Sequence, residues 1–112
     1  MFSLGIMICS LTQIQDPGAK PQYKLQEEQL VAYEERRLGF SRFYEAKTAG
    51  DKIDRVLRVW KDPTIRPGMY VVDEDFVQYR ISLVQLAIDK GLEYFDLTLE
   101  RLDSNYDINR KA

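Results

Sequence analysis

Apolar residues recur along the C-terminal part of the chain at the spacing of a helix. From Val77 to Leu102 the intervals between them are 4, 3, 4, 4, 3, 4 and 3 residues, which average close to the ~3.6 residues of one helical turn. Asp73, followed by two more acidic residues, is typical of a helix N-cap. The pattern predicts one long helix that continues through Gly91. Its main stripe consists of Val77, Ile81, Val84, Ile88, Leu92, Phe95, Leu99 and Leu102.

A second apolar face accompanies this stripe. A helix with two apolar faces is usually buried between two neighbours. A helix of thirty residues is roughly 45 Å long, which exceeds the roughly 35 Å diameter of a compact chain of this size. We therefore expect the helix of residues 76–102 to overhang the domain and to be covered by another protein chain. The expected partner interface consists of Phe76, Tyr79, Leu83, Leu86, Tyr94 and Leu97.

Two upstream stretches also have helical patterns. Residues 23–47 are rich in Glu, Gln, Leu, Ala and Arg, which favour helices, and Leu30 and Tyr33 are among the apolar residues at helical spacing. Residues 52–61 carry apolar side chains at the i, i+3, i+4, i+7 spacing of a short amphipathic helix. Trp60 completes that pattern, so we expect it in the core.

The first eleven residues are nearly all apolar. They are too few for the ~20 residues of a membrane-spanning helix, and they lack the basic start and the cleavage site of a signal peptide. We interpret them as a buried strand or a hydrophobic arm. The prolines and glycine of residues 15–21 predict a loop. Residues 69–72 form a short extended run that could pair with the N-terminal segment.

These patterns together predict a mostly α single domain over residues 1–112. Two long helices would pack as an antiparallel hairpin with the short amphipathic helix between them. The only β structure expected is a minor two-stranded ribbon formed by the N-terminal run and residues 69–72. Residues 1–21 would be an apolar arm or strand followed by a loop, and residues 106–112 a flexible tail.

Composition argues against several kinds of chemistry. The chain contains no histidine and a single cysteine, Cys9, so a Ser-His-Asp triad, a Cys-His pair and a Cys-rich zinc site are excluded. No nucleotide-binding fingerprint or repeat is present. We therefore expect no enzymatic activity, no catalytic residue, no cofactor and no metal. Cys9 lies in an apolar run and is expected to be a buried thiol, which fits the cytoplasm or another reducing compartment.

Charged residues form two patterns of opposite sign. Lys52, Arg55, Arg58 and Arg66 make a basic stripe within residues 52–66, which could meet phosphates. The acidic ridge of residues 89–103 could meet a basic partner and includes Asp89, Glu93, Asp96 and Glu100. For both patterns a solvated face is the simpler interpretation. The overall net charge of −2 predicts no strong attraction to nucleic acid.

The leading functional hypothesis from the sequence is a non-enzymatic interaction or assembly subunit. It would form a homo-oligomer, or dock into a larger complex, through the apolar faces of residues 76–102. The alternative is a small regulator or inhibitor of a nucleic-acid-handling system, acting through residues 52–66 or 89–103. Nucleic acid is the less favoured partner.

Overall fold

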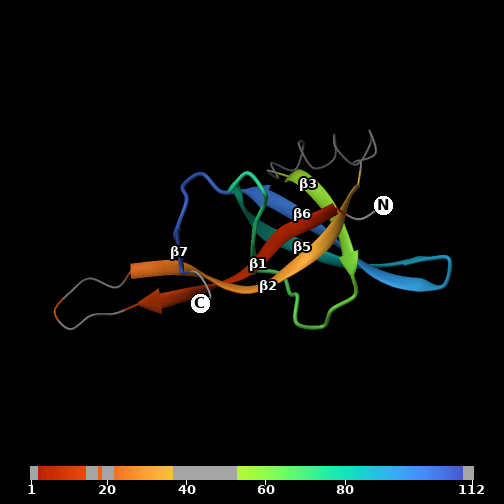
Figure 1. Ribbon diagram of the computed structural model, residues 1–112, viewed down its shortest axis with the longest axis horizontal. Coiled ribbons are helices and arrows are strands. Elements are labelled where there is room, and N and C mark those ends of the chain that lie inside the picture. Colours follow the sequence, from red (N-terminus) through yellow and green to blue (C-terminus); the bar gives the residue numbers. More distant parts are fainter. Residues whose placement is uncertain (1–2, 15–17, 19–21, 37–52, 110–112) are drawn as a thin grey trace.

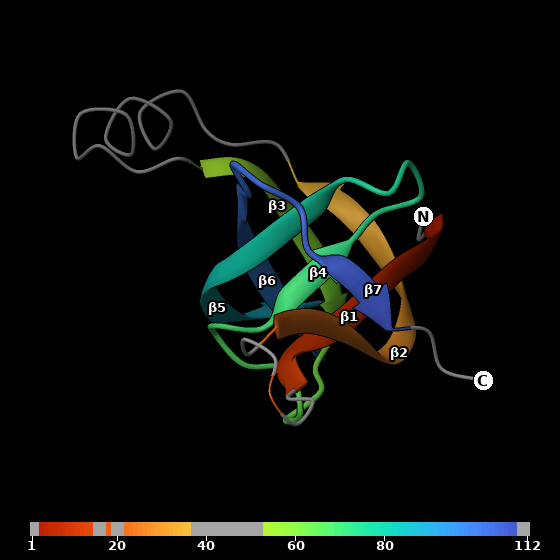
Figure 2. The same ribbon diagram turned by 90° about the vertical axis from the view of Figure 1, so that its left-hand side faces the viewer.

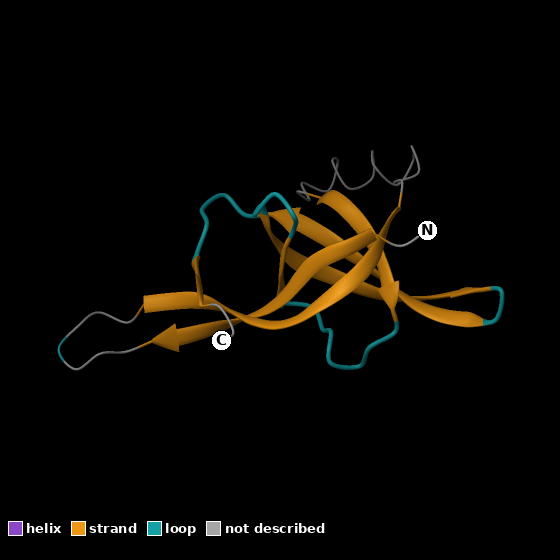
Figure 3. Cartoon of the chain, viewed as in Figure 1, coloured by secondary structure: helices purple, strands orange, loops and turns teal. Residues whose placement is uncertain are grey.

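The computed structural model describes residues 3–14, 18, 22–36 and 53–109, and its regular structure there consists of strands alone (Figure 3). The predicted mostly α fold, with its helical hairpin, is therefore wrong. The described residues include no helix that could cross a membrane. The strands are β1 (Ser3–Ile14), β2 (Gln22–Arg36), β3 (Ile53–Trp60), β4 (Tyr70–Val72), β5 (Gln78–Asp89), β6 (Leu92–Arg101) and β7 (Asp107–Asn109).

The strands form one sheet in the order β1-β4-β5-β6-β3-β2-β7, and β1 also pairs with β2. Six strands therefore close into a barrel in which every neighbouring pair is antiparallel. The short strand β7 adds to β2 in parallel. Figure 2 looks along the barrel, whereas Figure 1 shows hairpins that lengthen the molecule at both ends, to 52 Å.

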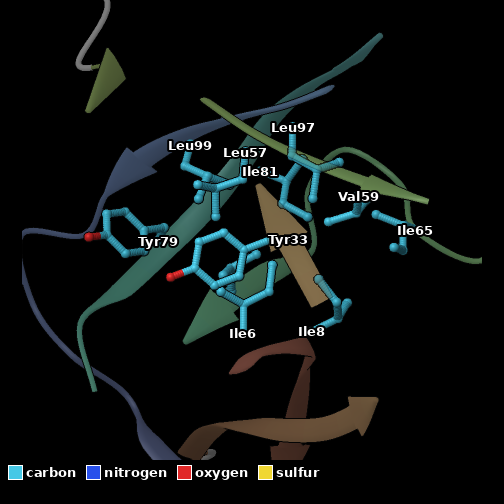
Figure 4. Close-up of a cluster of buried hydrophobic side chains, with 11 residues drawn as sticks. Ile6, Ile8, Tyr33, Leu57, Val59, Ile65, Tyr79, Ile81, Leu97 and Leu99 are labelled. Atoms are coloured by element: carbon cyan, nitrogen blue, oxygen red, sulfur yellow. The ribbon is translucent and has the colours of Figure 1, made fainter. Parts of the chain in front are cut away.

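The interior of the barrel is filled by aliphatic and aromatic side chains from all its longer strands (Figure 4). Alternation along β3 and β6 sends Leu57, Val59, Leu97 and Leu99 inward, and all four are at most 1% exposed. A smaller cluster around Cys9 and Leu25 fills one end. The main core comprises Ile6, Ile8, Tyr33, Leu57, Val59, Ile65, Val71, Tyr79, Ile81, Leu97 and Leu99.

The predicted long C-terminal helix is instead a hairpin of β5 and β6. A β-bulge between Ile81 and Leu83 inserts one extra residue into β5. The inward-facing positions therefore step by three residues from Ile81 to Val84, and then by two to Leu86 and Ile88. Because the bulge stretched one step of a period-two pattern, Ile81, Val84 and Ile88 imitated the spacing of a helix.

The predicted short helix of residues 52–61 is strand β3. Leu57 and Val59 point into the barrel, and Val56 and Trp60 lie on its outer face. Because both faces of β3 carry apolar residues, the strand lacks the polar–apolar alternation that would have revealed it. Trp60 was expected in the core, but it is 48% exposed.

The predicted helix of residues 23–47 and the segments before it also need correction. Residues 22–36 form β2, and residues 37–52 lie outside the described part of the chain. Strand β1 does pair with β4, placing Ile8 opposite Val71. That pairing belongs to the seven-stranded sheet, however, rather than to a separate ribbon. Apart from Gly18, the predicted loop of residues 15–21 is not described.

Strand β7 occupies part of the expected C-terminal tail, residues 106–112. It places Ile108 beside Leu25 of β2, and Ile108 packs against the smaller core cluster. Residues 110–112 are outside the described chain.

Candidate interaction surface

The end of the β5–β6 hairpin, residues 82–95, projects beyond the barrel and is called the arm below (Figure 1, right). On one side, β4 pairs with β5 only as far as Arg80, and Ile81 then exchanges backbone hydrogen bonds with the loop before β4. On the other side, the β3–β6 register ends where Trp60 lies opposite Tyr94. Within the described chain, most of the arm is therefore a two-stranded ribbon.

A tight turn closes the arm. Asp89 pairs with Leu92, so only Lys90 and Gly91 form the loop. Both have positive φ, 52° and 79° respectively, as in the type I′ turn whose twist matches that of antiparallel strands. Glycine adopts this conformation without steric cost, and the turn fixes the register of the arm.

Large apolar side chains are exposed on both faces of the arm. Leu86 and Ile88 continue the inward-facing row of β5 past the end of the barrel, and they are 53% and 67% exposed. Leu83 and Leu92 lie on the opposite face and are also exposed. The sequence had placed Leu83 and Leu86 in the partner interface. The structure brings them together on the arm, although they point to opposite faces of it.

Aromatic rings extend this surface to the base of the arm. Trp60 stacks on Tyr94, with ring centroids 4.8 Å apart, and the guanidinium of Arg58 lies 5.4 Å from the Tyr94 ring centroid. Tyr94 is buried beneath these neighbours. Trp60 therefore presents one face of a fixed indole ring to the outside, which is a common feature of interface anchors.

A shallow hollow of about 300 Å³ lies beside Trp60. Its lining is mostly apolar and includes Val31, Val59, Pro63 and Ile65. The hollow and Trp60 add a second contact area near the arm.

Two side chains of residues 52–66, Arg58 and Lys61, form ion pairs with the predicted acidic ridge on the neighbouring strand β6. Arg58 donates hydrogen bonds of 2.8 and 3.1 Å to the two carboxylate oxygens of Asp96. These bonds raise the pKa of Arg58. Lys61 forms an ion pair of 3.0 Å with Glu93. The cross-strand register thus neutralises much of the charge that the sequence had assigned to external partners.

Arg55 belongs to a polar cluster at one end of the barrel. Its guanidinium donates hydrogen bonds to Glu35 and Asp73 and lies 5.8 and 5.7 Å from the ring centroids of Tyr33 and Tyr79. Burial alone lowers the pKa of Arg55, but the hydrogen bonds, that to Glu35 first, outweigh it and the pKa is raised. Arg55 is therefore engaged within the fold.

The remaining predicted interface residues are dispersed. Tyr79 and Leu97 are core residues, and Tyr94 is buried under Trp60. Phe76 is 63% exposed in the β4–β5 turn, where its φ is 63°. Of the predicted set, only Leu83 and Leu86 are therefore exposed on the arm, one on each face.

The other charged residues are equally scattered. Arg66 is exposed in the β3–β4 loop, and Asp89 is exposed at the turn of the arm, with one oxygen 4.0 Å from Arg58. Glu100 lies opposite Arg80 in the β5–β6 ladder, and Lys52 lies outside the described residues.

Sequence reasoning did not name Ile88, Leu92 or Trp60 as interface residues, because it placed Trp60 in the core and the other two in the main stripe of the expected helix. The signal that could have exposed the error is the alternation of residues 84–88 followed by Asp89-Lys90-Gly91, a strand pattern followed by turn residues.

Comparisons with known proteins leave the function to be argued from the site itself. No protein-family model matches this sequence, and no curated protein resembles it closely enough to count as a relative. In the described part of the chain, no three acidic or cysteine side chains converge to hold a metal ion.

Proposed function

We propose that this chain is a non-enzymatic assembly subunit that self-associates, or docks into a larger complex, through the apolar arm. The observation that carries the proposal is the exposure of Leu86 and Ile88 on a hairpin that leaves the barrel. Clustered large apolar side chains on a projecting element are typical of protein–protein contact sites.

The energetics of the arm favour a covered state. A two-stranded hairpin alone in water is only marginally stable, and here most of the arm has no third strand within the described chain. Burying the exposed parts of Leu86 and Ile88 contributes on the order of 1 kcal/mol for each side chain, taking roughly half of a full burial. Leu83 and Leu92, exposed on the opposite face of the arm, offer further apolar surface to a partner.

The chemistry of the chain supports a binding role over a catalytic one. Cys9 is fully buried, and burial raises its pKa to about 12, so the thiol stays protonated and unreactive at neutral pH. Arg55, Arg58 and Lys61 pair with carboxylates of neighbouring strands. The same pairs weaken the case for a nucleic-acid regulator, because paired arginines are poorly placed to meet phosphates.

The proposal is tested by measuring the solution mass with light scattering on a size-exclusion column, over a range of protein concentrations. We expect particles heavier than the 13.1 kDa chain that become lighter in Ile88→Ser. The matched control is Leu30→Ser, because Leu30 is 61% exposed on β2, away from the arm. A compact monomer at every concentration would contradict the proposal, as would equal losses of mass in the two variants.

A further inference from the structure

The β5 strand has an open edge along the arm. From Ser82 to Asp89, its partner on one side is β6, and no described strand pairs with its other side. The open stretch begins directly after Ile81, whose N–H and C=O bond to Met69 and Gly68 at 2.8 Å each. An edge of this length is a template for a further strand.

The turn determines which backbone groups point to the open edge. In a two-residue hairpin the pair that flanks the loop, here Asp89 and Leu92, is hydrogen-bonded, and such pairs alternate along the ladder. The backbone groups of Ala87 and Gln85 therefore bond to β6, whereas the backbone N–H and C=O of Val84, Leu86 and Ile88 point to the open edge, away from β6. The outward bonds of Ile81 agree with this phase once the bulge is counted.

Nothing in the sequence of this edge discourages pairing. Residues 81–88 read Ile-Ser-Leu-Val-Gln-Leu-Ala-Ile and contain neither a charge nor a proline. Natural edge strands are usually protected by a lysine, a proline or a covering loop. The bulge at residues 81–83 lies at the base of the open stretch and leaves residues 84–88 in regular register.

We propose that this edge binds the same edge of a second copy of the chain, as an antiparallel pair centred on Leu86. The inference rests on the assembly role proposed above and specifies its partner and geometry. Leu86 of one copy lies opposite Leu86 of the other, and Val84 lies opposite Ile88. All three residues have backbone groups that point outward, so each such pair exchanges both hydrogen bonds.

Sterics select this register. With the two-fold axis at Leu86, the turn residue Lys90 of one copy reaches Ser82 of the other, where the open edge begins. Centring the pair on Val84 would drive the turn into residues that already pair with β4, and centring it on Ile88 would leave half of the edge uncovered. Centring it on Gln85 would place Asp89 opposite Ile81 and Lys90 opposite Arg80, but Ile81 already bonds to the loop before β4 and Arg80 already pairs with β4.

The side chains and charges are compatible with a second copy. The proposed register places Gln85 opposite Ala87 and Asp89 opposite Leu83, so no like charges face each other. The chain carries a net charge of only −2, so repulsion between copies is weak. An isologous contact of this kind closes on itself and gives a dimer rather than a fibre.

Cysteine cross-linking tests the register. In a Cys9→Ala background, Leu86→Cys should form an intermolecular disulfide under mild oxidation, because Cα atoms of a hydrogen-bonded antiparallel pair lie about 5.5 Å apart. Leu92→Cys is the matched control, being exposed on the same arm but on β6. Three strand spacings, roughly 14 Å, would separate it from its copy, so it should remain monomeric in denaturing gels. Absence of the Leu86→Cys product, or equal products from both variants, would overturn the inference.

A second pair of variants separates the edge from the faces of the arm. Leu86→Pro and Leu86→Ala both shorten the side chain, but only proline removes the outward N–H, and the β5–β6 bonds remain. We expect Leu86→Pro to be monomeric while Leu86→Ala still dimerises, with unchanged circular dichroism in both. A Leu86→Pro protein that associates like Leu86→Ala would overturn edge pairing but leave assembly through the arm intact. A wild-type monomer at every concentration would overturn both proposals.

Discussion

Two leucines on β6 should differ sharply in their contribution to stability. Leu97 is 0% exposed and packs among the inward-facing residues of the barrel, whereas Leu92 is 48% exposed at the tip of the arm. In the predicted helix, Leu92 belongs to the main stripe and Leu97 to the second apolar face, which was expected to meet a partner chain. Truncating each to alanine therefore distinguishes the observed fold from the predicted one.

The magnitudes follow from burial. Leu97→Ala removes a fully buried side chain and leaves a cavity, which should lower the free energy of unfolding by about 3 kcal/mol. For a domain of this size that corresponds to a fall in Tm of about 12 °C. Leu92→Ala removes a half-exposed side chain and should lower the free energy of unfolding by less than about 1 kcal/mol.

Urea unfolding followed by far-UV circular dichroism is the assay, at a protein concentration low enough to keep the chain monomeric. The urea dependence of the unfolding free energy should be the same in both variants, so that midpoints compare directly. A loss of stability in Leu92→Ala equal to or greater than that in Leu97→Ala would show that Leu97 is not a core residue of the barrel.

Three further predictions concern single buried groups. Cys9 has a pKa raised by burial from 9.0 to about 12, so stability should be intact below pH 9 and fall as pH rises toward 12, where only the unfolded thiol ionises. Cys9→Ala should show a shallower decline in urea titrations across that range, and an identical decline would contradict the assignment. The buried Oγ1 of Thr98 has no hydrogen-bond partner among the described residues. Thr98→Val should therefore leave the free energy of unfolding unchanged or raise it by up to about 1 kcal/mol, measured as an unchanged or higher Tm. A clearly lower Tm would show that the hydroxyl does contribute to stability. Asp73 accepts hydrogen bonds from the N–H groups of Asp75 and Val77 and from Arg55, so Asp73→Ala should cost about 3 kcal/mol in denaturant unfolding, and a near-neutral result would show that the cluster contributes little.

Some local features of the fold were within reach of sequence reasoning. Asp73 was expected to cap a helix, and its carboxylate does accept the N–H groups of Asp75 and Val77. The same chemistry closes a β4–β5 turn instead of starting a helix. A pairing of the N-terminal run with residues 69–72 was considered from the sequence, because apolar runs flanked by turn residues favour strands, and β1 does pair with residues 70–72.

The fold class was out of reach because local pattern and tertiary structure disagree. Strand β2 is built largely from Glu, Gln and other good helix formers, and pairing with β1 along nearly its whole length overrides that weak preference. In β5 a single bulge between Ile81 and Leu83 changed the apparent period. Neither the pairing nor the bulge can be read from spacing alone.

The candidate surface was partly visible in the sequence. The prediction that residues 76–102 would meet another chain rested on a long helix with two apolar faces, and the structure has a β-hairpin there instead. The choice of interface residues also depended on whether the segment was taken as a helix or as strands. In a strand, with a period of two, Leu86 and Ile88 lie on one face of the arm. In a helix, with a period of 3.6, Ile88 belongs to the main stripe and Leu86 does not.

Amide hydrogen exchange along the arm reports directly whether the open edge of β5 pairs with a second copy of the chain. Gln85 and Ala87 bond to β6 and should be protected at every protein concentration, which makes them internal controls. We expect the Leu86 amide to exchange rapidly in dilute protein and to become protected as the concentration rises and dimers form. Rapid exchange at Leu86 in concentrated protein, with Gln85 and Ala87 still protected, would contradict it.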